Sequence, residues 1–222
     1  MGQRLKILNL YAGIGGNRKL WGDEHEIVAV EYDERVAAVY KDLFPNDTVI
    51  VADAHAYLLE HFESFDFIWS SPPCPSHSQM RKNMSVGVMG AKPLYPDMKL
   101  YEEILLLQHY FDGGWVVENV RPYYEYLIEP NVMLGRHPYW TNFEIAPKEY
   151  EADGIKAVGA TEKLAERFGY DLSKYDLPDK RKALRNAVNP EMGLYILNSY
   201  PQKLSTGGTY ETTRRSDQHF YK

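Results

Sequence analysis

The first 120 residues alternate apolar, strand-like segments with helical ones, and this alternation leaves few folds open to the chain. Helical segments show apolar residues spaced three and four apart, most clearly over 98–111. Strands that are apolar throughout and alternate with helices indicate an α/β fold, with a mostly parallel sheet covered by helices on both faces. The five predicted strands are 6–13, 25–33, 48–55, 65–73 and 115–120.

Beyond residue 121 the pattern is looser. A β-hairpin is predicted over 132–145, where Gly135 and Pro138 interrupt the apolar residues. A helix is predicted over 161–169, and residues 182–200 also have a helical period. Within the latter, Pro190 must lie near a helix start or a break, because proline lacks the N–H that a helix interior requires.

Composition excludes several classes of protein. A single cysteine among 222 residues rules out a disulfide scaffold and a cysteine-rich zinc site, so we expect no metal. No apolar run approaches the roughly 18 residues of a membrane helix, and the N-terminus lacks a signal-peptide layout, so we expect a cytoplasmic protein. The net charge of −6 does not demand a polyanionic partner, although basic residues cluster at 81–82 and 180–185.

Glycines and acids follow the first three predicted strands. Residues 11–16 read YAGIGG, a turn that lets the backbone approach a ligand closely. Glu31 and Asp53 follow the next two strands, where ligands bind in open α/β sheets. Glu31 can accept both ribose hydroxyls of a nucleoside, and Asp53 an adenine amino group. Without a phosphate-binding lysine, an uncharged or cationic nucleoside such as S-adenosylmethionine fits best. The alternative is that both acids are helix N-caps or solvated loop residues.

Cys74 and Glu118 follow the fourth and fifth predicted strands. Cys74 lies in SSPPCPSHS, where flanking prolines stiffen the turn and would hold the thiol at the ligand-binding edge as a nucleophile. Its alternative role is that of a small buried apolar residue. Glu118 follows the apolar WVV, so partial burial would favour its protonated form and make it a proton donor. Its alternative role is an ion-paired residue at a strand end.

In order along the chain, these segments resemble the C5 cytosine methyltransferase family. The similar motifs are NLYAGIGG, EYDERVAAVY, DTVIVADAH, FDFIWSSPPCPS, VVENV and LRNAVNPEMG, over residues 5–122 and about 182–198. The resemblance implies a Rossmann-like S-adenosylmethionine-dependent methyltransferase fold with a small C-terminal appendage. It also implies cofactor contacts from Tyr11, Ala12, Gly13, Gly15, Gly16, Glu31, Tyr32, Asp53, Ala54, Pro73, Asn186 and Val188.

The family's mechanism implies a role for each motif. A cytosine of duplex DNA turns out of the helix, the Cys74 thiolate adds to C6, Glu118 contacts N3, and C5 takes a methyl group. Arg136 is the best candidate for the family's arginine near the target base. The substrate contacts implied by the resemblance are Ser76, Ser78, Arg81 and Asn119.

The chain also departs from the family. Pro75 replaces the usual glutamine after the cysteine, and Arg185 replaces a glycine. Only residues 146–181 remain for target recognition, too few for an independent core. We therefore expect that the chain reads a very short site or that a separate specificity subunit supplies recognition. We expect a catalytic and cofactor-binding domain over 1–145 and a reduced recognition segment over 146–181. A C-terminal helix over 182–200 would complete the catalytic domain, and 201–222 would form a flexible tail.

Three alternative functions remain. One branch of the same family methylates tRNA, so RNA is a candidate substrate. A non-catalytic nucleic-acid-binding protein could use the same fold, although the presence of Cys74 and Glu118 argues against lost activity. A nicotinamide-dependent dehydrogenase is disfavoured because the third glycine of that fingerprint is missing.

Overall fold

The structure is a computed structural model that describes residues 3–79, 81–150 and 160–201. The strands are β1 (Lys6–Leu10), β2 (Glu26–Glu31), β3 (Thr48–Val51), β4 (Phe67–Ser70), β5 (Gly114–Glu118), β6 (Val132–Leu134) and β7 (His137–Thr141). The α-helices are α1 (Glu34–Leu43), α2 (Ala54–His61), α3 (Lys99–Tyr110), α4 (Ala160–Phe168), α5 (Lys180–Asn186) and α6 (Pro190–Ser199). Three further short helices are η1 (Asn17–Leu20), η2 (Phe62–Ser64) and η3 (Arg81–Val86).

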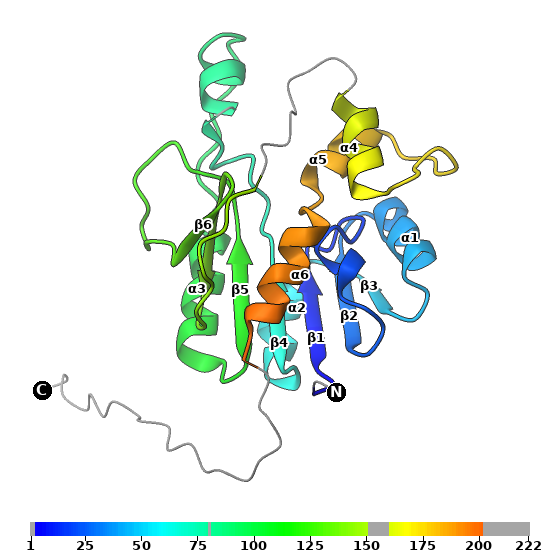
Figure 1. The fold of residues 1–222 in the computed structure, drawn as a ribbon. Helices are drawn as coiled ribbons and strands as arrows, with labels where there is room; N and C mark the ends of the chain where they lie inside the picture. Colours follow the sequence, from blue (N-terminus) through cyan, green and yellow to red (C-terminus); the bar gives the residue numbers. More distant parts are fainter. Residues whose placement is uncertain (1–2, 80, 151–159, 202–222) are drawn as a thin grey trace, which may run out of the picture.

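The described strands form one sheet in the order β3-β2-β1-β4-β5-β7-β6 (Figure 1). The first five of these are parallel, whereas β7 runs antiparallel to both β5 and β6. This mostly parallel sheet confirms the predicted Rossmann-like α/β fold. The hairpin predicted over 132–145 is also confirmed, and Gly135, with a φ of 58°, makes its turn.

Helices cover both faces of the sheet (Figure 1). Alternate residues of β1 face opposite sides: Leu8 and Leu10 pack with residues of α2 and α3, and Ile7 packs with residues of α6. α1 lies on the same side as α6, where Tyr40 packs on Ala29 of β2. Because β1, β2, β4 and β5 are buried on both faces, their sequences are largely apolar, which is the pattern that predicted the sheet, whereas the edge strand β3 is only partly buried.

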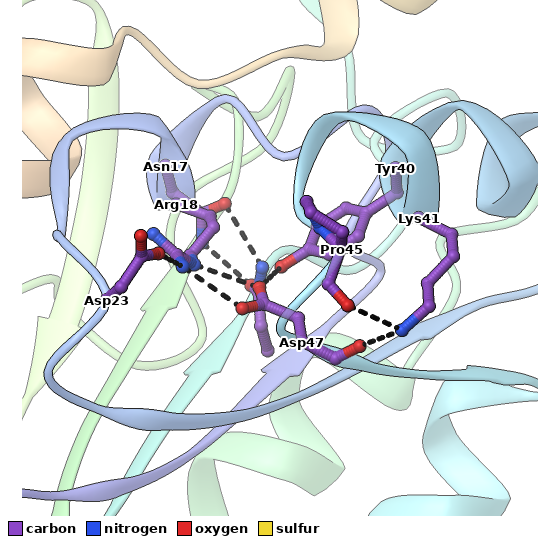
Figure 2. Close-up of polar contacts among 8 residues, drawn as sticks. Asn17, Arg18, Asp23, Tyr40, Lys41, Pro45 and Asp47 are labelled. Carbon is purple, nitrogen blue, oxygen red and sulfur yellow. Dashed lines mark hydrogen bonds and ion pairs between the residues drawn. The ribbon is translucent and has the colours of Figure 1, made fainter.

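A buried polar cluster fixes the start of η1 (Figure 2). The Arg18 guanidinium donates two hydrogen bonds to the Asp47 carboxylate, at 2.9 and 3.0 Å, and one to Asp23 at 2.9 Å. Tyr40 Oη also donates to Asp47, at 2.8 Å. Arg18 and Asp47 are both only 3% exposed, so each charge depends on the other for compensation. The cluster therefore ties the residues after the glycine loop to α1 and to the start of β3.

The region predicted as a reduced recognition segment has no separate core in its described part. Apolar residues of α4, α5 and the loop between them share one buried cluster with Ile14 of the glycine loop and Val39 of α1. Lys19 Nζ also donates to the Gly169 carbonyl and lies 3.9 Å from the Tyr170 ring centroid. Sharing a core with the first domain is what a segment of this length requires.

Residues 182–200 belong to two helices rather than one. Asn189 caps α6 by accepting from the backbone N–H groups of Glu191 and Met192, and Pro190 occupies the first turn, as predicted. The predicted tail lies outside the described residues apart from Pro201. Among the described helices, none has the length and apolar character needed to cross a membrane.

Candidate active site

The glycine loop and Glu31 form the best-defined part of the site. Glu31, the last residue of β2, accepts one backbone N–H bond on each carboxylate oxygen, from Gly13 and from Asp33, both at 2.9 Å. Each oxygen keeps a lone pair for a further donor. Gly13 has a φ of 56°, and no atom lies within 4 Å of where its Cβ would stand. Open space therefore borders a fixed carboxylate, as an adenosyl group requires.

The C-terminal segment closes one side of this loop. A Cβ on Gly16 would lie 2.3 Å from the Val188 carbonyl oxygen and 2.7 Å from its nitrogen, so only glycine allows the contact. Ala12 N donates to Val30 O at 3.0 Å, and Gly15 N donates to Ala12 O at 2.9 Å. The structure thus brings together the predicted cofactor residues of the loop, Glu31 and Val188, and they fit S-adenosylmethionine.

For the other predicted cofactor residues, the structure gives less support for a place in the cofactor site. Asp53 is the N-cap of α2, accepting from Ala56 N at 2.9 Å, and its other oxygen lies 3.6 Å from Lys99 Nζ. The N-cap alternative is therefore realised, and contact with adenine stays a prediction. Tyr32 is largely exposed. The remaining three predicted residues lie on other elements: Ala54 in α2, Pro73 directly before the cysteine and Asn186 at the end of α5.

Backbone and side-chain hydrogen bonds hold the Cys74 loop against the end of β5. Asn119 Nδ2 donates to the Pro72 carbonyl at 3.0 Å, and the Cys74 carbonyl accepts from the backbone N–H groups of His77 and Ser78, at 3.0 and 3.1 Å. Tyr123 N then donates to the His77 carbonyl at 3.0 Å. A tight turn and Asn119, more than the prolines alone, therefore position the thiol.

Charges of both signs act on the Cys74 thiol. Burial and the nearby Glu118 carboxylate raise the thiol pKa, whereas Arg185 and Arg136 act to lower it. Glu118 is 13% exposed, which confirms its predicted partial burial, and lies 3.8 Å from His137 Nε2. Arg136 occupies the hairpin turn between β6 and β7, beside the end of β5. The three predicted catalytic residues thus share one edge of the sheet.

The predicted substrate residues have intramolecular partners here. Ser76 Oγ accepts from Asp97 N at 3.0 Å, and Ser78 Oγ accepts from Arg81 N at 3.4 Å. Arg81 Nε is buried and, among the described residues, has no hydrogen-bond partner. Asn119 is buried, with its amide engaged by Pro72 and by Val120 N. Its observed role is positional, and substrate contacts by all four residues stay a prediction.

A cavity of about 400 Å³ lies beside the Cys74 loop, next to the bridge between Ser78 and Pro122. Its lining does not include Cys74 or Glu118. The residues around it are Gln79, Arg121, Pro122, Tyr124, Glu125, Tyr126 and Glu129.

For two groups of buried polar residues near the site, the sequence predicted no role. His77 is buried, its Nδ1 bonds with Tyr124 Oη, and burial lowers its pKa. Glu103 of α3 is also fully buried and bonds with Tyr11, Ser70 and His55. One signal could have revealed Glu103, because it shares the apolar face of its helix with Leu100 and Leu107, at spacings of three and four.

Comparison with known proteins agrees with the motifs. Residues 5–98 match the family model of the C-5 cytosine-specific DNA methylase. A search of curated proteins found no match. The chain is similar to a hypothetical protein of Thermus thermophilus, with 19% identity, 62% of this chain and 74% of that one covered, and a TM-score of 0.40.

Two further similar structures are methyltransferases by name. A DNMT2 variant from Spodoptera frugiperda has 26% identity, covering 52% of this chain and 35% of that one, with a TM-score of 0.36. A SAM-dependent methyltransferase from Agrobacterium tumefaciens has 14% identity, covering 55% and 40%, with a TM-score of 0.35. The family match confirms the suspected family over residues 5–98, which carry a C-5 cytosine-specific DNA methylase domain, and it supports S-adenosylmethionine as the cofactor.

Proposed function

We propose that the protein is a DNA (cytosine-5-)-methyltransferase that acts through a covalent adduct on Cys74. The observation that carries this proposal is the shared position of the Cys74 thiol and the Glu118 carboxyl. Asn119 follows Glu118 and bonds to Pro72, two residues before the cysteine, so the two groups are held at adjacent strand ends. Addition to cytosine requires a nucleophile that reaches C6 from one face of the ring and an acid that reaches N3 at the edge of the ring.

The chain's own residues account for the activation of the ring. The Cys74 thiolate forms a bond to C6, and the electron pair displaced from the C5–C6 bond moves through the ring toward N3. Glu118 donates a proton or hydrogen bond to N3 and offsets the charge that develops there. S-adenosylmethionine, when bound, supplies the methyl group that C5 receives. A base then removes the C5 proton, and the sulfur leaves C6 as the thiolate to restore the aromatic ring.

The cofactor side of the site has separate roles. Glu31 keeps one lone pair free on each oxygen, and these can accept the two ribose hydroxyls. The space at Gly13 admits the adenosyl group close to the backbone. Asp53 would accept from the adenine amino group while it caps α2.

Duplex DNA is the proposed substrate, with the target cytosine turned out into the site. The loop 75–97 carries Arg81, Lys82 and Lys92, and α5 carries a further basic cluster near the same edge. These groups would contact phosphates on the two sides of the turned-out base. Because the described part of 146–181 shares the core of the catalytic domain, we infer that the chain itself reads a very short site.

Expression in a methylation-free bacterial host, followed by bisulfite sequencing of the host DNA, tests this function. We expect methylated cytosines at one short sequence, and none with Cys74→Ala, which should still bind S-adenosylmethionine in calorimetry. Full activity in Cys74→Ala would overturn the nucleophile assignment. Purified protein should be assayed in parallel on duplex DNA and on tRNA with labelled cofactor.

Each other outcome assigns a different function. Label in tRNA alone would make the enzyme an RNA methyltransferase. Cofactor binding without transfer to either substrate would indicate a non-catalytic protein. Activity that requires a second protein for site selection would point to a separate specificity subunit.

A further inference from the structure

Glu103 is a carboxylate in the core of the protein, with 0% of its side chain exposed. A buried charge is tolerated only where hydrogen bonds or an opposite charge compensate it. Glu103 has both: Oε1 accepts from Tyr11 Oη at 2.6 Å and lies 3.0 Å from His55 Nδ1, and Oε2 accepts from Ser70 Oγ at 2.6 Å. Both oxygens of the carboxylate therefore have partners within the chain.

The three partners come from three different parts of the candidate site. Tyr11 is the first residue after β1 and opens the glycine loop. Ser70 is the last residue of β4, where the chain leaves the sheet toward Cys74. His55 lies in the first turn of α2, whose N-cap is Asp53. One side chain on α3 thus joins the cofactor loop, the nucleophile loop and the helix that follows β3.

The backbone of Tyr11 shows why this junction is needed. Tyr11 has a φ of 54°, and it is the one non-glycine residue in the described part of the chain with a positive φ. A bulky side chain rarely adopts this left-handed conformation unless other contacts hold it there. The hydroxyl bond to Glu103 is such a contact, and burial followed by the Glu103 charge raises the pKa of Tyr11. The tyrosine therefore remains a donor throughout the usual assay range.

We propose that Glu103 is a positioning residue that fixes the S-adenosylmethionine loop relative to the Cys74 loop and makes cofactor affinity depend on His55. The proposal rests on the proposed function for its cofactor, but not for the contacts that carry it. With Glu103 in place, the loop after β1 is already in its bound conformation before the cofactor arrives. Preorganisation of this kind lowers the entropic cost of binding.

The sign of the pH dependence follows from the charges around His55. The hydrogen bond with Glu103 has the largest effect on the His55 pKa and raises it. Burial and the Lys99 charge act to lower this pKa, and the Glu102 charge acts to raise it. Tyr11 and Asp53 are the other titratable groups nearby. Because the His55 pKa is raised in the folded protein, the ion pair between His55 and Glu103 is fully formed below the ordinary histidine pKa of 6.5. The pair is lost as the pH rises through the raised His55 pKa. Cofactor affinity should therefore fall across that interval.

The test compares Glu103→Gln with Glu102→Gln. The second change removes the same charge from the adjacent residue, which is 60% exposed and lies 3.4 Å from His55 Nε2. Calorimetric titration with S-adenosylmethionine should be run from pH 6 to pH 9, after circular dichroism has confirmed folding. We expect about tenfold weaker binding and a flattened pH dependence for Glu103→Gln. Glu102→Gln should stay within about twofold of the wild type and keep a pH dependence, with its midpoint moved slightly to lower pH because Glu102 also helps to raise the His55 pKa.

Hydrogen exchange of the ligand-free protein gives a second readout. Glu103→Gln, and to a smaller extent Ser70→Ala, should speed exchange in both 11–16 and 70–78, whereas Glu102→Gln should not. Unchanged affinity and unchanged exchange in Glu103→Gln would overturn the inference. A wild-type protein that fails to bind the cofactor would instead refute the proposed function, and the exchange result would still decide the role of Glu103.

Discussion

The ion pair between Arg18 and Asp47 offers a direct test of how the fold supports the glycine loop. Asp47→Asn keeps the shape of the side chain but removes the charge that balances the Arg18 guanidinium (Figure 2). The remaining carboxylate, Asp23, is 71% exposed and contacts a single guanidinium nitrogen. Removing one partner of a buried pair costs about 3–5 kcal/mol, and the asparagine oxygen retains part of the hydrogen bonding. We therefore expect a loss of about 3 kcal/mol in the free energy of unfolding.

Urea unfolding followed by tryptophan fluorescence measures this loss. With a slope of about 2–3 kcal/mol/M, the midpoint should fall by roughly 1 M. Asp23→Asn is the matched control, because it removes the same charge from an exposed partner and should cost about 0–1 kcal/mol. The reasoning is refuted if Asp47→Asn costs less than about 1 kcal/mol, or if the two variants lose equal stability.

Two further predictions concern the site itself. Gly16→Ala would place a Cβ 2.3 Å from the Val188 carbonyl oxygen, so the segment around Val188 must move. We expect S-adenosylmethionine binding to weaken by more than about tenfold in calorimetry. Unchanged affinity would contradict a close contact between Gly16 and Val188. Because Cys74 is the chain's single cysteine, iodoacetamide alkylation reports on it alone. Its raised pKa predicts a rate that still increases above pH 9, with the midpoint moved down by Glu118→Gln and up by Arg136→Gln. A midpoint below pH 8 that neither change moves would refute the assigned charges.

The sheet and its functional edge could be predicted from sequence because both depend on local signals. Each parallel strand is a short, largely apolar run, and the candidate site residue stands at the end of the strand: the glycines after β1, Glu31 at the end of β2 and Glu118 at the end of β5. Parallel strands place all such positions on one edge whatever the strand order. The strand order itself did not have to be known to bring these residues together.

Other features depend on pairings between distant residues, and no local pattern shows them. Glu103 bonds to Tyr11, which is 92 positions away, and Arg18 bonds to Asp47, 29 positions away. Asp53 shows a different limit, because the same carboxylate geometry serves as a helix cap and as a hydrogen-bond acceptor for a ligand. The sequence therefore identifies which residue stands at the end of each strand, whereas the side chain that it bonds to can be found only from the structure.

The packing of α4 and α5 has a consequence for recognition. Since their apolar side chains are buried with Ile14 and Val39, the described part of this region does not form a recognition domain of its own, although the basic side chains of α5 could still contact phosphates. Base contacts would then come from loops around the edge, above all 75–97 and the turn at Arg136. Each correctly read base pair contributes about 1–3 kcal/mol of discrimination, so few contacts can define only a short site. A long recognition sequence measured for the isolated chain would therefore require contacts that this arrangement does not supply.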